Sequence, residues 1–279
     1  MKKPLRAAFQ GELGAFSQIA LRQLLGPDAV PVPCERFEQV FRSLKDGAVD
    51  RAVIPIENTL HGSIHENYDH LLHFDLDIIG ETSVRIVHNL IAPPGVKWKN
   101  IRRVLSHPVA LNQCLSFFAA HPHLERVTHY DTAGSVKTIM QEQPSDAAAI
   151  ASSVAAEIYG AHILKRSIED DRQNFTRFFL LSRPGTKISP PGPVEKKTSL
   201  VFTTRNTPGA LFRTLSAFAL RDLSLTKIES RPLRGKPFEY LFYVDVLADV
   251  AEPRMRKALG HLEELADFLR VLGCYPRGK

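Results

Sequence analysis

The chain has 279 residues, 44% of them hydrophobic and 24% charged, an ordinary balance for a soluble globular protein and enough length for about two domains. Its formal net charge is +6, but the lysines and arginines are scattered with no basic run longer than two, which argues against nucleic-acid binding and favours a small anionic ligand. No apolar stretch approaches the ~18 residues of a membrane span, the N-terminus lacks a signal-peptide pattern, and the three separated cysteines fit reduced thiols, so a cytoplasmic location is expected.

Predicted strands and helices alternate through the first part of the chain. Strands are predicted at residues 5–9, 49–56, 77–82, 101–105, 126–130 and 147–151, with helical patterns between them. This alternation is typical of α/β layers with largely parallel sheets. Around residues 77–93 the chain stays extended, which predicts a crossover between two lobes, with a return near 150–175.

The first strand is followed by a glycine-containing turn that opens a helix. Gly11 and Gly14 let the backbone approach a ligand closely, and the helix start, with Ser17, offers free N–H groups to an anion. Glu35 lies about one βαβ unit later, as in a nucleotide-binding fold, but the GxGxxG spacing is absent. An ordinary βα turn remains the structural alternative.

A second strand ends at Asn58, for which no structural role is evident. Ser63 and Glu66 are spaced as a capping box for the next helix, so Ser63 has both a structural and a possible ligand role. His61 and His65 are four residues apart, but no third ligand is spaced to join them, so no metal site is predicted.

Two further strand-to-helix turns carry polar groups. Ser106 precedes Pro108 and is predicted to cap the following helix, with Gln113 further along it. A Ser–His hydrolase is not supported, because adjacent residues at a helix start do not face each other and no nucleophile elbow is present. Asp131 and Thr132 begin the next such turn, where capping is again the simple explanation.

The segment from Ile168 to Leu181, IEDDRQNFTRFFLL, places Asn174, Thr176 and Arg177 at the mouth of an apolar run. The run is closed by Ser-Arg-Pro-Gly and predicts a buried strand. Polar groups at the end of a buried strand are costly unless they serve a site.

A domain boundary is predicted from composition. Residues 184–197 are rich in proline and lack hydrophobic periodicity, which indicates a semi-rigid linker between regions 1–183 and 198–279. After it come a strand at 198–204, a helix at 209–221, strands at 225–233 and 239–247, a helix at 253–268 and a strand at 269–275. This βαββαβ order is ferredoxin-like.

The motifs occur in the order GELGAFS, PIENTLHGSI, SHPVALNQC, DTAGS, ASSVAAEIYG and NFTRF. In this order they resemble prephenate dehydratase followed by an ACT regulatory domain, over about residues 4–276. The resemblance implies active-site positions at Thr176, Asn58, Ser106 and Gln113 and, by motif, at Glu57, Arg177 and Phe178. Further substrate contacts are expected at Gly11, Gly14, Ser17, Ser63, Thr132 and Asn174.

The resemblance implies a two-lobed catalytic region like type II periplasmic binding proteins, followed by the ferredoxin-like ACT domain. It implies a carbon–oxygen lyase, monofunctional and without a cofactor, that converts prephenate to phenylpyruvate in phenylalanine biosynthesis. Arogenate is the rival substrate, and a non-enzymatic amino-acid sensor is the alternative from another class. NTPGALF and ESRP imply allosteric phenylalanine binding at Asn206, Pro208, Gly209, Ala210, Leu211, Glu229, Ser230 and Arg231. Self-association through ACT domains, as a dimer or tetramer, is expected.

Within this reaction, the Thr176 hydroxyl is the hypothesised donor to the leaving hydroxyl group. Threonine is a poor acid, so a preorganised hydrogen-bond donor or relay is expected rather than a free acid. Asn58, Ser106 and Gln113 are expected to be neutral donors to carboxylate. Arg177 is either a carboxylate anchor or the partner of a structural acid such as Asp170 or Asp171.

Overall fold

The structure, a computed structural model, describes residues 4–186, 194–204, 206–233, 235–236 and 239–278. Residues 187–193 of the predicted linker therefore lie outside the described residues. The chain divides into two compact units, one formed by Met1–Phe74 and Thr82–Leu180 and the other by Asp75–Glu81 and Leu181–Lys279. No helix within the described ranges is both long enough and apolar enough to cross a membrane.

The first lobe is built on a sheet with the strand order β2-β1-β3-β11-β5, in which residues 77–81 of β5 and 181–182 of β11 are grouped with the second unit. The strands are β1 (Arg6–Gln10), β2 (Val30–Cys34), β3 (Arg51–Asn58), β5 (Asp77–Arg85) and β11 (Phe175–Ser182). β1 runs parallel to β2 and β3, as expected of strands linked by helices. The helices are α1 (Phe16–Leu25), α2 (Phe37–Lys45) and α3 (His65–His73), and they bury apolar side chains such as Leu21 and Phe41.

The second lobe contains a five-stranded sheet in the order β10-β6-β9-β7-β8. Its strands are β6 (Asn89–Ala92), β7 (Arg103–Ser106), β8 (Glu125–Thr128), β9 (Ala147–Ala151) and β10 (His162–Lys165). Its helices are η1 (Trp98–Asn100), α4 (Pro108–Asn112), α5 (Leu115–Ala119), α6 (Thr132–Glu142) and α7 (Ser153–Tyr159). β6 is antiparallel to both β9 and β10, so the prediction of largely parallel sheets fails at this edge.

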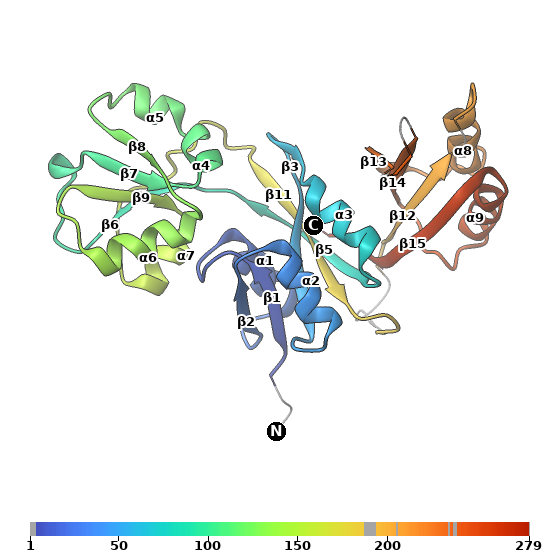
Figure 1. The fold of residues 1–279 in the computed structure, drawn as a ribbon, viewed down its shortest axis with the longest axis horizontal. Coiled ribbons are helices and arrows are strands. Elements are labelled where there is room, and N and C mark those ends of the chain that lie inside the picture. The colour runs from blue at the N-terminus through green and yellow to red at the C-terminus, as the bar shows by residue number, and fades with distance from the viewer. Residues whose placement is uncertain (1–3, 187–193, 205, 234, 237–238, 279) are drawn as a thin grey trace. The chain divides into compact units, whose positions relative to one another are not determined.

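Two extended connections join the lobes, one after β5 and one before β11 (Figure 1). The two-lobed α/β organisation predicted from the sequence is thus confirmed. The predicted capping box of Ser63 and Glu66 is wrong. Ser63 belongs to the short strand β4 (Gly62–Ser63), which pairs with β3 opposite Glu57, and α3 begins after Ile64 without a side-chain cap.

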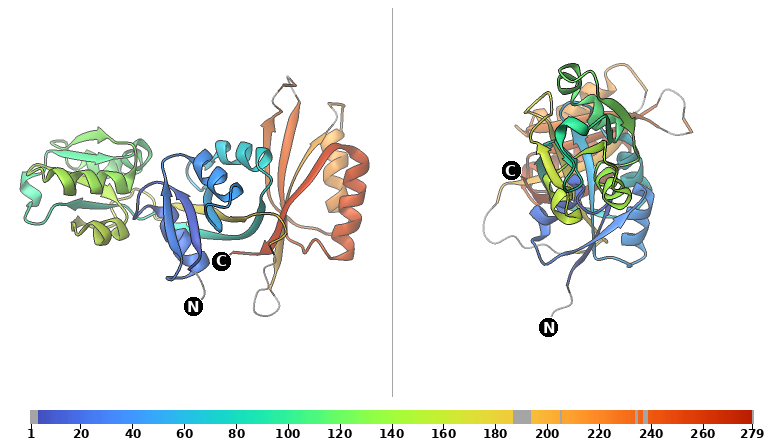
Figure 2. Two further views of the ribbon diagram at one scale, coloured as in Figure 1. Left: turned by 60° about the horizontal axis from the view of Figure 1, so that its bottom comes forward. Right: turned by 90° about the vertical axis from the view of Figure 1, so that its left-hand side faces the viewer.

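The C-terminal part forms the predicted βαββαβ fold. Its elements are β12 (Lys196–Thr204), α8 (Ala210–Ala219), β13 (Leu225–Pro232), β14 (Tyr240–Val246), α9 (Pro253–Leu265) and β15 (Ala266–Pro276). The sheet order is β13-β14-β12-β15 with antiparallel pairing, and both helices cover one face of it (Figure 2). Phe202, Phe218 and Met255 are fully buried between these layers. The last helix ends at Leu265, earlier than predicted, because the chain there enters the β15 ladder.

Candidate active site

A cavity of about 290 Å³ lies in the first unit and is lined by residues of both lobes. Its wall combines apolar side chains with a few polar groups that come from strand ends and helix starts. The lining residues are Phe16, Ser17, Pro55, Asn58, His61, Ile64, Ile86, His88, His107, Val109, Ala110, Gln113, Thr132, Thr176 and Phe178. A concave, mostly apolar space with few convergent polar groups is the usual form of a small-molecule site.

Asn58 and Thr176 meet at this cavity from the neighbouring strands β3 and β11. Asn58 Nδ2 donates to Thr176 Oγ1 at 2.9 Å and to Asn174 Oδ1 at 2.7 Å. A 180° flip of the Asn58 amide would break two hydrogen bonds, because Asn58 Oδ1 accepts the backbone N–H groups of Leu60 and His61. The Thr176 oxygen is therefore engaged as an acceptor, which leaves its own hydrogen available to another acceptor.

Gln113 faces the cavity between two histidines. Its Oε1 lies 2.8 Å from His88 Nε2, and its Nε2 lies 3.2 Å from His61 Nδ1. His88 is 1% exposed, and burial lowers its pKa below the usual histidine value, although Gln113 and Glu169 act in the opposite direction. His88 is therefore neutral at neutral pH.

The predicted cap at Ser106 is wrong. The N-cap of α4 is His107, whose Nδ1 accepts the backbone N–H of Val109 at 3.2 Å, and burial lowers the pKa of His107. Ser106 is fully buried, and its hydroxyl donates to the carbonyl of Ile150 at 2.7 Å, joining β7 to β9. Its single hydrogen is thus used within the lobe, and Ser106 does not line the cavity.

Histidines are the only titratable side chains among the residues described as lining the cavity, and none of these residues is Lys, Arg, Asp or Glu. Arg177 alternates along β11 with Thr176 and Phe178, which do line the cavity. Its Nη1 lies 3.9 Å from Glu57 Oε2, and its guanidinium lies over the ring of Phe179. Neither Arg177 nor Glu57 belongs to the cavity wall, so the structure does not support a carboxylate anchor there.

The acids proposed as structural partners of Arg177 are engaged elsewhere. The carboxylate of Asp170 accepts the backbone N–H groups of Leu115 and Ser116 at the start of α5, and Asp171 accepts that of Gln173. The strand period of two explains why consecutive residues of the NFTRF motif point to opposite faces.

The β1–α1 loop is held by the second lobe. A Cβ built on Gly14, which has φ +91°, would lie 2.5 Å from Ala155 Cα, so only glycine fits. Ser152 Oγ donates to the Gly14 carbonyl at 2.6 Å. Ser17 lines the 290 Å³ cavity, whereas Gly11 lines a separate cavity of about 550 Å³. Gly14 therefore positions this loop by packing.

Asn174 and Ser63 were predicted to contact the substrate, but neither lines the cavity. Asn174 is fully buried and accepts a hydrogen bond from Asn58, and Ser63 lies in β4 next to Ile64. Thr132, at the start of α6, does line the cavity beside the cap residue Asp131, whose carboxylate accepts the N–H of Gly134. The capping explanation for Asp131 is thus confirmed.

Comparison with known proteins decides the family. The family model "Prephenate dehydratase" matches residues 7–186, most of the first unit and more than half of the chain. The chain belongs to the prephenate dehydratase family. It is therefore an enzyme of the lyase class that acts by dehydration and decarboxylation. A second model, "ACT domain", matches residues 198–267.

Individual relatives of this prephenate dehydratase family member agree over nearly its whole length. It is 48% identical to "Arogenate dehydratase/prephenate dehydratase 2, chloroplastic" of Arabidopsis thaliana, over 98% of this chain and 73% of that protein. The structure of "Prephenate dehydratase in complex with L-Phe" from Arthrobacter aurescens has a TM-score of 0.89 at 33% identity, covering 98% of this chain and 90% of that one. A structure described as "GqqA- a novel type of quorum quenching acylases" has a TM-score of 0.89 at 34% identity, covering 97% of both chains.

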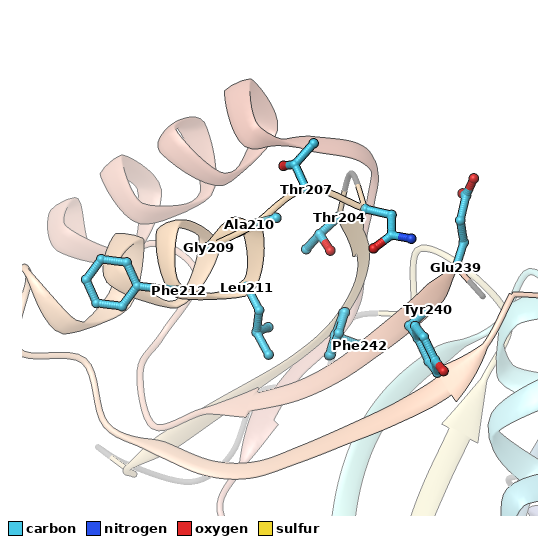
Figure 3. Close-up of a pocket in the computed structure, with 10 residues that line it drawn as sticks. Thr204, Thr207, Gly209, Ala210, Leu211, Phe212, Glu239, Tyr240 and Phe242 are labelled. Atoms are coloured by element: carbon cyan, nitrogen blue, oxygen red, sulfur yellow. The ribbon is translucent and has the colours of Figure 1, made fainter.

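The ACT domain carries a further cavity of about 240 Å³ at the start of α8 (Figure 3). Four predicted ligand residues line it: Asn206, Gly209, Ala210 and Leu211. Gly209 is the N-cap of α8 with φ +74°, and no side chain caps the helix. The Ala210 N–H donates to the Thr207 carbonyl at 3.1 Å, so an anion at this helix start would meet the N–H groups that follow Ala210. Leu211 and Phe242 lie on one side of the loop, whereas Phe212 points away from them.

The remaining predicted ligand residues of the ACT domain do not line this cavity within one chain. Glu229, Ser230 and Arg231 lie on the edge strand β13, and Ser230 is paired with Phe242 of β14. Pro208 contributes its carbonyl to Arg213 Nη1 instead. Sequence reasoning missed Thr204 at the end of β12, Tyr240 and Phe242 of β14, and Glu239 just before β14, all of which line the cavity.

Sequence reasoning also missed several groups of the first cavity. His88, Ile86 and Ile64 belong to short segments whose apolar character resembles ordinary core, and the spacing of His61 from His65 suggests only a possible metal ligand. The contact of His61 with Gln113 joins residues 52 positions apart, for which no local pattern exists.

Proposed function

We propose that this protein converts prephenate to phenylpyruvate, with loss of CO2 and of the ring hydroxyl. The observation that carries the proposal is the hydrogen bond from Asn58 Nδ2 to Thr176 Oγ1. It orients the threonine hydroxyl as a donor toward the cavity, where the leaving hydroxyl of prephenate would accept it. Because the amide stabilises a developing alkoxide, Thr176 also becomes a better donor than a free threonine.

The reaction needs little else from the protein. The bond to the carboxyl carbon breaks, CO2 leaves, and the electron pair of that bond enters the ring as the opposite C–O bond breaks, so the ring becomes aromatic. The departing hydroxide accepts the hydrogen bond of Thr176, and a proton that comes from solvent completes the water molecule, so that Thr176 ends the reaction neutral. The apolar wall, including Phe16, Ile86 and Phe178, removes water from the departing carboxylate. Gln113, Ser17 and Thr132 provide neutral donors that hold the substrate in line.

The composition of the cavity lining supports prephenate rather than arogenate as the proposed substrate. Arogenate carries an ammonium group where prephenate has a keto group, and an ammonium group inside a small cavity needs an anionic partner. The described lining offers no Asp or Glu for that purpose. Because several relatives are named arogenate dehydratase, prephenate and arogenate should both be assayed with the same preparation of the enzyme.

The deciding assay follows phenylpyruvate by its absorbance and phenylalanine by chromatography. We expect a larger kcat/KM with prephenate. A larger kcat/KM with arogenate would reverse the substrate assignment, and absence of turnover with both would favour the amino-acid-sensing binding protein.

An acylase is the second candidate, because a structure described in those words is 34% identical over nearly the whole chain. An acylase needs an activated nucleophile or water. In the described cavity, His61 and His88 bond to Gln113, and His107 bonds to the backbone of Val109, rather than to a hydroxyl group. We therefore expect no hydrolysis of N-acyl amides, and release of a free amine from such a substrate would support the acylase instead.

We also propose feedback control by phenylalanine at the ACT cavity. The N–H groups that follow Ala210 in the first turn of α8 suit the carboxylate of the amino acid, and Leu211, Tyr240 and Phe242 suit an aromatic ring. Allosteric coupling is typically about 1–3 kcal/mol, or roughly 5- to 150-fold in affinity. The Arthrobacter protein in complex with L-Phe supports this choice of ligand.

Calorimetry with the full chain tests the regulatory site. Gly209→Val should weaken phenylalanine binding at least about tenfold, because a branched side chain crowds the loop. Gly160→Val is the matched control, since Gly160 also has a positive φ, of +68°, and has open space around its Cβ position. Equal loss of binding in both variants would contradict the site.

We further propose self-association through the ACT domain. Phe212 and Leu220 of α8 are 77% and 76% exposed, and β13 ends the sheet as an edge strand. Light scattering of the full chain is expected to give a dimer or a tetramer, and a monomer at micromolar concentration would contradict this.

The free cysteines fit the expected cytoplasmic location.

A further inference from the structure

His88 is a buried histidine that the reaction described above leaves without a role. It lies in the connection between β5 and β6, is 1% exposed, and has the ring of Phe16 at its edge at 5.7 Å. Burying a histidine costs free energy unless its polar atoms are used. Its position in the cavity wall, next to Gln113, suggests what the ring does.

The backbone around His88 is fixed by the segment that returns to the first lobe. The His88 N–H donates to Glu169 Oε2 at 3.0 Å, and the His88 carbonyl accepts the N–H of Ile168 at 2.9 Å. The Glu169 side chain is 1% exposed, and its other oxygen lies 3.1 Å from Arg85 Nη2. A buried, paired carboxylate thus holds His88 in place.

The same segment also holds Gln113, since the N–H of Asp170 donates to the Gln113 carbonyl at 2.8 Å. His88 and Gln113 are therefore tied to consecutive residues, 169 and 170, and their side chains meet at 2.8 Å. Their relative position is set by the backbone and not by the flexible ends of long side chains.

The tautomer of His88 selects the orientation of the Gln113 amide. The ring is neutral, so one nitrogen carries the proton. If Nε2 donates to Gln113 Oε1, the buried Nδ1, which has no partner among the described residues, is a bare acceptor. The flipped amide would place the proton on Nδ1 and leave a buried N–H unpaired, and such orphaned N–H groups are rarer and costlier than orphaned acceptors.

We propose that His88, held by Glu169, is a positioning residue that directs the NH2 group of Gln113 to the substrate. With Oε1 fixed on His88, one Nε2 hydrogen reaches His61 Nδ1 and the other is free for a carboxylate of the substrate. His88 acts through Gln113 in this arrangement. The inference rests on the proposed dehydratase function, because it assigns Gln113 a substrate to bind.

The experiment is a double-mutant cycle on kcat/KM with the full-length protein and prephenate. His88→Phe keeps an aromatic ring against Phe16 and removes the donor, and we expect kcat/KM to fall by about ten- to a hundredfold, as for other misplaced binding groups. In a Gln113→Ala background the same change should have an effect of less than about twofold, because a residue that acts through Gln113 has nothing left to position.

Two conservative variants separate positioning from folding. His88→Gln can place an N–H near the former Nε2 and should restore most of the activity, whereas His88→Asn places its amide near the former Nδ1 and should not. His121→Phe is the control, since it removes a histidine that contacts the Phe117 carbonyl away from the cavity. This comparison decides the question even if His88→Phe does not fold.

Each outcome bears on one claim. Normal kcat/KM in His88→Phe, equal activity in the Gln and Asn variants, or an undiminished effect in the Gln113→Ala background overturns the positioning role while the dehydratase assignment stands. If the wild type turns over neither prephenate nor arogenate, the proposed function fails first, and the positioning role for this reaction fails with it.

Discussion

Replacing Thr176 with valine removes one hydroxyl group from the cavity and keeps the volume of the side chain. In the folded protein this hydroxyl accepts Asn58 Nδ2 at 2.9 Å. The amide nitrogen has two hydrogens and three acceptors within reach, the others being Asn174 Oδ1 at 2.7 Å and the Phe175 carbonyl at 3.2 Å. Both hydrogens therefore keep an acceptor when the hydroxyl is lost.

The expected cost to stability is consequently small. No buried donor is left unpaired, so the loss is that of one neutral hydrogen bond, about 0.5–1.5 kcal/mol. For a chain of this size, each kcal/mol of lost stability lowers Tm by roughly 2–4 °C. Thr198→Val is a matched control, because Thr198 is a fully buried threonine whose hydroxyl donates to the Ala248 carbonyl outside the cavity.

The expected cost to catalysis is much larger. A preorganised donor at a charge that develops in the transition state is worth about 2.7–4 kcal/mol, which is about a 10²- to 10³-fold loss in kcat. KM should change little, since the bond strengthens mainly as hydroxide departs. Thr176→Ser keeps the donor and should lose less than about tenfold, and Thr198→Val should keep normal kcat.

Phenylpyruvate formation under saturating prephenate measures kcat, and thermal unfolding checks each variant. A Thr176→Val enzyme within about threefold of the wild type would place less than about 1 kcal/mol on this hydroxyl. That result would remove Thr176 as the donor to the leaving group.

Three further outcomes are expected. Gly14→Ala should lower the free energy of unfolding by roughly 2–4 kcal/mol, from the positive φ and the contact with Ala155, while Gly160→Ala should cost only about 1 kcal/mol; equal losses in denaturant melts would contradict the packing argument. In the unfolded chain, His88 binds a proton below its usual pKa of ~6.5, whereas burial lowers the pKa of His88 in the folded protein. Tm should therefore fall as the pH is lowered from about 7.5 to about 5.5, and it should fall less steeply in His88→Gln. EDTA should leave turnover unchanged, and loss of activity that a divalent metal restores would show that the cavity histidines bind a metal.

Several features of this protein follow from local sequence alone. The βαββαβ order after the proline-rich segment was predictable because apolar periodicity and turn residues act over a few neighbours. The turn at Gly14 and the cap at Asp131 were found for the same reason. Local rules failed where a tertiary pairing offered more, as when β4 took Ser63 from its predicted capping role.

The site itself was only partly predictable. The motifs brought out Asn58, Gln113 and Thr176 as polar groups at strand and helix ends, and all three line the 290 Å³ cavity. Only the tertiary structure decided that Asn58 meets Thr176, 118 positions away, and that Arg177 faces the opposite side of β11. His88 gave no local indication, because a histidine within a short apolar segment acquires its role from the groups that the fold packs against it. Hydrophobic patterning determines which elements form, whereas the pairing of distant strands determines which polar atoms share one desolvated cavity.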